Sequence, residues 1–129
     1  MYLLDTDIVV FAIRGNKAVL QRLGQLSADQ WGISAITSFE IQKGIEANPT
    51  TRSSTNAQEF LAAVEPWKFD SAASTRAARV FQQLRTEGIT IGTADEMIAG
   101  HALSMKAILV TNNQKHFERV PGLKLESWL

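Results

Sequence analysis

Short apolar segments alternate with helix-forming segments along this chain, and that order constrains its fold more than any other feature. Four segments have the apolar character of strands, at residues 2–5, 31–34, 107–111 and 122–128. Segments with helical apolar spacing lie at 8–13, 17–26, 35–47, 56–64, 71–87, 94–104 and 115–119. Alternation of this kind predicts an α/β fold, a three-layer α/β/α sandwich with a mostly parallel central sheet.

Residues that favour turns and helix ends punctuate the pattern. Asp70 or Ser71 opens the long alanine-rich helix and Gly88 closes it. Pro49 and the polar stretch around it, residues 48–55, predict a loop. Pro66 ends the preceding helix, and "WKFD" at 67–70 is a further short segment that could form a strand.

Length and composition limit the class of protein. A chain of 129 residues is predicted to form one domain over 1–129. No apolar run reaches the roughly 20 residues that cross a bilayer, and the N-terminus has no signal-peptide pattern, so a cytoplasmic location without membrane contact is expected. Without cysteine, any metal must bind oxygen atoms or the two histidines. Thirteen basic and thirteen acidic residues balance, which neither favours nor excludes nucleic acid.

Two carboxylates, Asp5 and Asp7, follow the first predicted strand directly. Two unit charges about 4 Å apart repel by about 4 kcal/mol at an effective dielectric of about 20. Such a pair needs a helix N-terminus, a basic partner or a bound cation. Either residue is also a good N-cap for the helix predicted from Ile8.

Four polar residues occupy comparable places in the predicted elements: Asp5, Glu40, Asp95 and Asn113. Each lies just past a strand or near the head of a helix. Because ligands bind beyond the carboxyl ends of parallel strands, these positions favour a shared site. Hard oxygen donors without cysteine favour Mg²⁺ or Mn²⁺.

Each of these residues also has a purely structural interpretation. Glu40 would be either a solvated helix residue or part of a Ser/Thr-x-x-Glu capping box with Thr37. Asp95 near a helix N-terminus stabilises the helix dipole. Asn113 is a common turn residue. The joint pattern, and no single residue, indicates a functional site.

Four segments spread along the chain resemble a known family. "LLDTDI", "ISAITSFEIQKGIE", "IGTADEMIAGHALSMKAILVTNN" and "FERVPGLKLESW" are similar to PIN-domain ribonucleases, specifically the VapC toxins of bacterial toxin–antitoxin systems. The resemblance runs from Met1 to Trp128 and implies a PIN-like fold.

That resemblance implies an acidic pocket for Mg²⁺, with Mn²⁺ as the alternative. Carried over, its catalytic residues are Asp5, Glu40, Asp95 and Asn113, with Asp5 and Asp95 as the metal ligands. Asp7 stands where the family usually has Asn, so it adds a charge at the metal or caps a helix. Asn113 stands where related nucleases often have an acid. The expectation is one tightly held metal ion, with a second left open.

The same resemblance implies a Mg²⁺-dependent endoribonuclease toxin that leaves a 5′-phosphate and a 3′-hydroxyl. Its RNA substrate is expected to be tRNA, with initiator tRNA first, and its partners a VapB-type antitoxin and a second copy in a homodimer. Val9, Val10, Phe11 and Ile13 either line an antitoxin groove or pack in the core. Glu40 either holds the metal through water or helps to deprotonate the nucleophile.

Further polar residues are candidates for supporting roles. Phosphate contacts would come from basic side chains, at Arg14, Lys17, Lys43 and Lys115. Thr6 and Thr111 are placed to orient carboxylates or phosphate. His101 is expected to be packed in a helix and His116 to lie on the surface.

Two other classes of protein, a phosphatase and a non-catalytic binding scaffold, match parts of this pattern. "LLDTDIV" and "ILVTN" match the opening motifs of haloacid-dehalogenase-type phosphatases, but the remaining residues lack that family's later lysine and acidic pair. A non-catalytic PIN-like scaffold would bind RNA or protein without cutting, and it has no need of clustered acids that repel RNA.

Overall fold

The computed structural model describes residues 1–129 and consists of four strands and seven helices. In chain order these are β1 (Tyr2–Leu4), α1 (Thr6–Ile13), α2 (Lys17–Gly24), β2 (Trp31–Ile33), α3 (Ala35–Ala47), α4 (Arg52–Ala63), α5 (Ser71–Thr86), α6 (Thr93–Met105), β3 (Ile108–Val110), α7 (Gln114–Phe117) and β4 (Leu125–Glu126). None of these helices has the length and apolar character that crossing a membrane requires.

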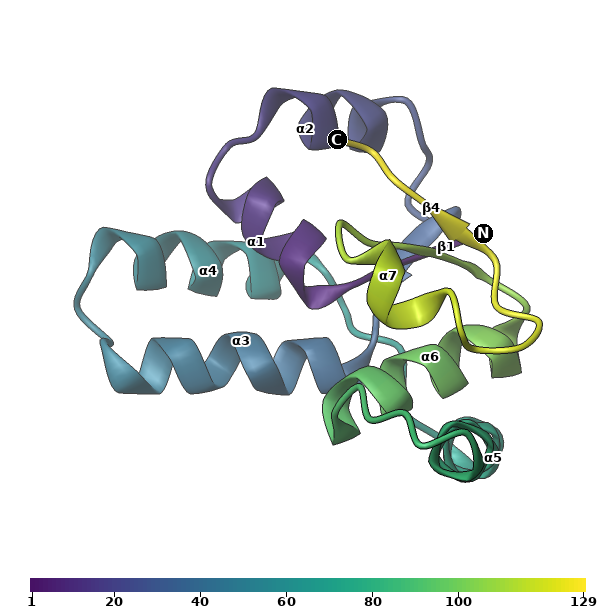
Figure 1. Ribbon diagram of the computed structural model, residues 1–129. Coiled ribbons are helices and arrows are strands. Elements are labelled where there is room, and N and C mark those ends of the chain that lie inside the picture. The colour runs from purple at the N-terminus through teal and green to yellow at the C-terminus, as the bar shows by residue number, and fades with distance from the viewer.

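The strands form one sheet in the order β2-β1-β3-β4, and every neighbouring pair is parallel. The predicted α/β fold is therefore confirmed, with a sheet that is parallel throughout. Every strand points its carboxyl end toward the same edge, and the segments that leave β1 and β3 meet there (Figure 1).

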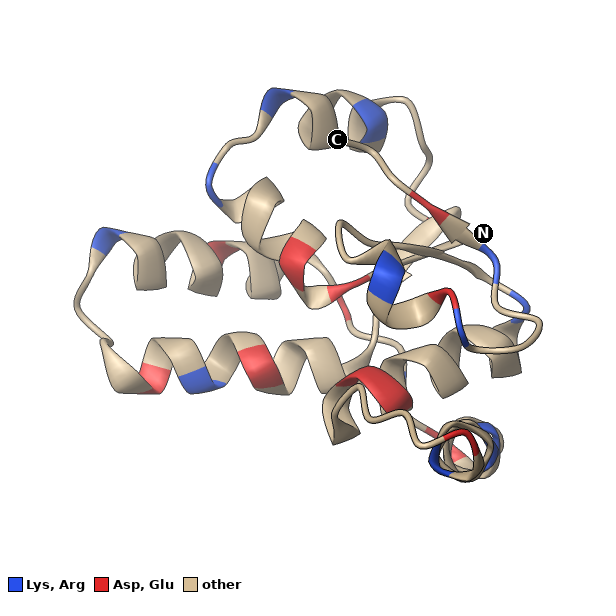
Figure 2. Ribbon diagram, in the orientation of Figure 1, with Lys and Arg blue, Asp and Glu red and all other residues tan.

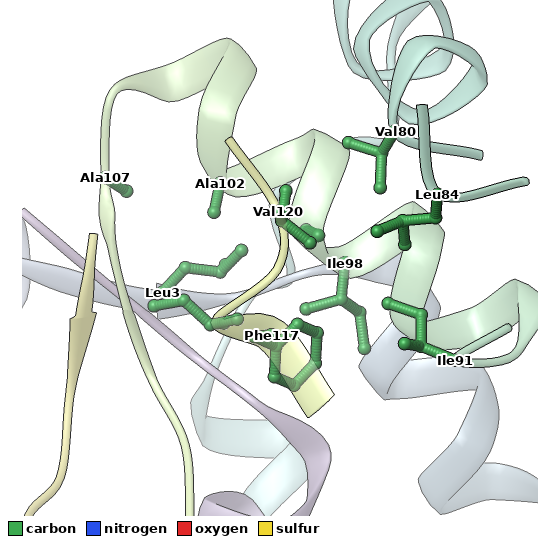
Figure 3. Packing of buried hydrophobic residues seen from close by; sticks show 11 residues of the cluster. Leu3, Val80, Leu84, Ile91, Ile98, Ala102, Ala107, Phe117 and Val120 are labelled. Carbon is green, nitrogen blue, oxygen red and sulfur yellow. The ribbon is translucent and has the colours of Figure 1, made fainter. Parts of the chain in front are cut away.

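Successive strand residues face opposite sides of the sheet, and each side has its own core. Leu3 and Leu109 pack in a cluster with α5, α6 and α7, whose Phe117 fills its centre (Figure 3). Leu4 and Val110 pack in a second cluster with α1 to α4. Because both faces are covered, β1, β2 and β3 are apolar without a polar alternate, as is usual for parallel sheets, whereas the edge strand β4 carries Glu126.

Two local predictions are wrong. The stretch 48–55 is not a loop throughout, because α4 already begins at Arg52, where the Thr51 hydroxyl accepts the Ser54 N–H at 3.1 Å and caps the helix. "WKFD" is not a strand, since Trp67 makes only an isolated bridge to Ser34. The remaining elements are present, with ends shifted by a few residues.

The long helix α5 has the predicted N-cap. The Asp70 carboxylate accepts the Ala73 N–H at 2.9 Å, and Gly88 follows the helix with a positive φ of 73°. Helix α5 packs closely against α6, with Ala77 of α5 in contact with Gly100 of α6.

Substitution of Gly100 by alanine is expected to destabilise the chain by about 3 kcal/mol, because α5 and α6 touch at this residue. A Cβ at Gly100 would overlap the backbone of Ala77 and lie 2.7 Å from its Cβ. The free energy of unfolding in urea measures the effect. Gly44→Ala is the control, since Gly44 in α3 has no atom within 4 Å of a Cβ and the change should be neutral or stabilising. Equal stability of both variants would contradict the packing described.

Candidate active site

Asp5 lies between the end of β1 and the start of α1, and it is only 5% exposed. Its Oδ1 accepts the Thr6 N–H at 2.8 Å, which makes Asp5 the N-cap of α1. Its Oδ2 accepts the Thr111 hydroxyl at 2.7 Å, from the residue that follows β3. This hydrogen bond supports the role suggested for Thr111, which is to orient a carboxylate.

Asp7 lies in the first turn of α1 and is half-buried. Its Oδ2 accepts the Asn112 N–H at 3.1 Å. Its Oδ1 is buried without a hydrogen-bond partner. Because Asp5 caps the helix, Asp7 is not needed for capping, and it keeps one oxygen for a donor or cation from outside the chain.

Glu40 does not form the predicted capping box with Thr37. Helix α3 is capped instead by Ser34, whose hydroxyl accepts the Ile36 N–H at 3.0 Å. The Glu40 carboxylate accepts the Thr6 hydroxyl at 2.6 Å, and the Thr37 hydroxyl lies 3.0 Å from that of Thr6. Glu40 is thus held against Thr6 at the start of α1, and its charge acts on Asp95.

Asp95, in the first turn of α6, has a partner that the sequence did not predict. Its Oδ2 lies 2.8 Å from Nδ1 of His116 in α7. His116 was expected on the surface, and its side chain is indeed 42% exposed, yet one edge contacts the acidic site. The two residues are far apart in the chain, and nothing in the local sequence of either one signals the pair.

The Asn113 side chain makes no hydrogen bond to the acids. Asn113 is exposed, and its backbone N–H donates to the Thr111 hydroxyl at 3.0 Å. It thus orients Thr111, which in turn donates to Asp5. His101 is packed as predicted, because it is buried and its Nδ1 lies 2.8 Å from the Ser34 hydroxyl.

Burial and mutual repulsion shift the protonation of these acids. Burial, followed by the charges of Asp7 and Asp95, raises the pKa of Asp5 to about 7, against the hydrogen bonds that it accepts. Burial also raises the pKa of Asp7. The pKa of Asp95 is raised by burial, although its contact with His116 opposes the shift. The hydrogen bonds that Asp5, Asp7 and Asp95 accept therefore do not offset the cost of burying their negative charges.

The residues fit a hard divalent cation held by few protein ligands. No three His, Asp or Glu side chains lie close enough together to hold one ion among themselves. Mg²⁺ commonly uses only one or two carboxylates and keeps several waters. All the available donors are oxygens, and the unpartnered Oδ1 of Asp7 is what a site completed by a cation would leave.

The His116 contact predicts a positioning role for that side chain. With hydrogen on Nδ1, the ring fixes one oxygen of Asp95 and leaves the other for a ligand. His116→Leu should weaken Mn²⁺ binding about 10- to 100-fold, as for other residues that hold a metal ligand in place. Electron paramagnetic resonance of free Mn²⁺ measures the affinity. His116→Asn places an N–H near the same point and should restore most of it; equal losses in both variants would contradict positioning.

Comparisons with known proteins identify the family and the fold. The PIN domain family model matches residues 2–123. The tRNA(fMet)-specific endonuclease VapC of Shigella flexneri is 34% identical over 128 residues, which is 98% of this chain and 97% of that protein. The crystal structure of VapBC2 from Rickettsia felis bound to a promoter DNA fragment is similar with a TM-score of 0.89, at 32% identity and 99% and 98% coverage. For DNA-bound VapBC from Salmonella typhimurium the TM-score is 0.87, at 29% identity and 99% and 98% coverage.

The match to the PIN model covers most of the chain, whereas the phosphatase alternative rested on the opening motifs alone. The later lysine and acidic pair that the phosphatase family requires are also missing from the chain. Both findings exclude the phosphatase alternative. PIN-domain nucleases are generally dependent on a divalent metal. The chain belongs to the PIN-domain family, and within it to the VapC ribonucleases.

Proposed function

We propose that the chain is a cytoplasmic, Mg²⁺-dependent endoribonuclease toxin that acts as a single PIN domain over residues 1–129, with Mn²⁺ as an alternative ion. Asp5 and Asp95 are the proposed metal ligands. One observation carries the proposal: Asp5 is buried beside Asp7, whose Oδ1 has no partner, at the carboxyl edge of a parallel sheet. Buried acids that repel one another are costly unless a cation joins them.

The chain's own residues supply orientation and proton handling. A cation bound at this edge supplies polarisation of the phosphodiester and activation of a water. Thr111 holds Asp5 at 2.7 Å, and Asn113 supports Thr111 through its backbone N–H. Glu40, held at 2.6 Å by Thr6, is the proposed acceptor of a proton from an attacking water, or alternatively a ligand of the metal through water.

Basic side chains flank these acids and are suited to the RNA backbone. Arg14 lines a groove of about 440 Å³ together with Thr6 and Glu40. Lys115, in α7, is next to His116, which contacts Asp95. Figure 2 shows a basic segment in α7 and acidic segments in α1 and at the start of α6. Lys17 and Lys43 are further candidates on the exposed surface. A phosphate chain held by Arg14 and Lys115 would pass the acidic edge.

Transfer RNA, and initiator tRNA first, is the proposed substrate. The support is the name of the Shigella flexneri relative, a tRNA(fMet)-specific endonuclease that is alike over nearly its whole length. Cleavage is proposed to leave a 5′-phosphate and a 3′-hydroxyl.

The groove between α1, α3 and α4 is the proposed seat of a VapB-type antitoxin. The apolar wall of the groove is formed by Val10 and Ile13 of α1 with Ile41 and Ile45 of α3. Val9 of α1 is instead buried in the core. Glu40 lies in the groove, so an occupant there would cover the acidic site. Similarity to VapBC complexes supports such a partner, and a homodimer of the toxin is also proposed.

Sequencing of RNA ends after brief induction in cells tests the substrate and the chemistry together. We expect new 5′-phosphate ends within one class of tRNA, and their loss when antitoxin is co-expressed. Growth arrest without any new RNA ends would favour the non-catalytic scaffold and contradict the proposed activity.

A further inference from the structure

A second cavity lies beside the acidic site and is lined entirely by polar residues. Its volume is about 390 Å³, within the range of about 300–1,000 Å³ typical of small-ligand pockets. The lining residues come from the segment after β3 and from the end of the chain: Thr111, Asn112, Asn113, Gln114, Lys115 and Ser127. None of the metal or proton-transfer roles assigned above accounts for its carboxamides.

Backbone contacts fix this cavity relative to the acids. Thr111 lines it and donates to Asp5 at 2.7 Å. The Asn112 N–H donates to Asp7 at 3.1 Å, and the Asn113 N–H donates to Thr111 at 3.0 Å. Residues that line the cavity therefore bond directly to the carboxylates of Asp5 and Asp7, and these bonds fix the position of the cavity relative to the acids.

The carboxamides of this segment are free for a ligand. Asn112, Asn113 and Gln114 are exposed, and the bonds that hold the segment use the backbone N–H groups of the first two, not their side chains. Lys115 forms no ion pair within the chain, where the two ion pairs are Arg22–Glu126 and His116–Asp95. Several adjacent amide groups with one cation form a surface that combines hydrogen-bond donors and acceptors with a positive charge.

This chemistry suits one nucleotide of single-stranded RNA better than it suits phosphate alone. Asn and Gln side chains pair with base edges through one donor and one acceptor, whereas phosphate needs only cations and N–H groups. Unstacked bases in RNA loops are the usual targets of such contacts. We propose that this cavity binds the base of a nucleotide flanking the cleaved bond, with Gln114 and Asn112 reading the base and Lys115 binding its phosphate. The proposal rests on the ribonuclease function above.

Cleavage of RNA hairpins that differ by one base on either side of the cut tests this reading. Wild type should prefer one base at one flanking position, and Gln114→Ala should reduce that preference about tenfold. Gln114→Glu, which lacks the amide donor, should change which base is preferred. Gln83→Ala, an exposed glutamine in α5, is the control and should behave as wild type. Unchanged base preference in both Gln114 variants would overturn the proposal.

A binding experiment separates this inference from the proposed activity. Titration of the wild-type chain with AMP, GMP, CMP or UMP should shift the backbone amide NMR signals of residues 111–115 and 127 for one base more than for the others. That selectivity would support the base pocket even if no RNA were cut. Cleavage without base-selective shifts would overturn it. So would Gln114→Ala weakening the antitoxin complex about tenfold with base preference intact, because the cavity would then be a protein contact.

Discussion

Asp5→Asn is expected to lower RNA cleavage by at least about a hundredfold while the chain remains folded. Asparagine keeps an oxygen for the Thr6 N–H and preserves the cap of α1, since Asn and Asp are equally good N-caps. What it removes is the negative charge that a divalent cation requires at this edge of the sheet. The rate of hairpin cleavage at saturating Mg²⁺ and the circular dichroism spectrum measure activity and folding separately.

A matched control is available in the same fold. Asp70 caps α5 as Asp5 caps α1, by accepting an N–H at 2.9 Å, but it has no place in the acidic site. Asp70→Asn should therefore cut RNA at the wild-type rate. Asp95→Asn should lose activity as Asp5→Asn does. Cleavage by a folded Asp5→Asn chain at the wild-type rate would contradict the assigned role.

The second large effect is a loss of stability of the metal-free chain as the pH rises. Folding raises the pKa of Asp5 from 3.8 to about 7, so between these values the folded state holds a proton that the unfolded state has released. The stabilisation from this protonated group is complete below about pH 4 and is lost as the pH rises through about 7. Each pKa unit corresponds to 1.36 kcal/mol, which gives a loss of up to about 4 kcal/mol.

Urea unfolding in EDTA at pH 5 and pH 8 measures the part of that loss that lies above pH 5, about 3 kcal/mol. Asp5→Asn should be more stable than wild type at pH 8, because the repelling charge is gone, whereas Asp70→Asn should follow wild type. Addition of Mn²⁺ at pH 8 should restore the wild-type stability, because the ion binds only the folded site. An identical dependence on pH in wild type and Asp5→Asn would show that Asp5 does not carry the buried charge.

Much of the fold was predictable because its signals are local. Apolar runs located all four strands, and the N-cap Asp70 located the start of α5. The start of α4 was missed because Pro49 and the polar residues after it resemble a loop, while Thr51 acts as a cap. Trp67 has the β propensity of a strand residue, but it pairs only through one isolated bridge, to Ser34, the residue that follows β2.

The acidic residues and the two hydroxyls that orient them, Thr6 and Thr111, were identified from the sequence, but which acid each hydroxyl contacts and the His116–Asp95 pair were not. Hydrogen bonds from Thr6 to Glu40 and from His116 to Asp95 join residues that are 34 and 21 positions apart. The capping box of Thr37 and Glu40 fitted the local sequence pattern. In the structure Ser34 caps α3 instead, and Glu40 bonds to Thr6 of α1.

The sequence by itself determined the parallel α/β order and the oxygen-only set of acids, because apolar periodicity and residue chemistry are properties of short segments. Only the tertiary structure decided which acid is buried, which oxygen lacks a partner, and that a polar cavity lies beside them. Those features arise where the ends of β1 and β3 meet α1, α6 and α7, and contacts between distant segments leave no local trace in the chain.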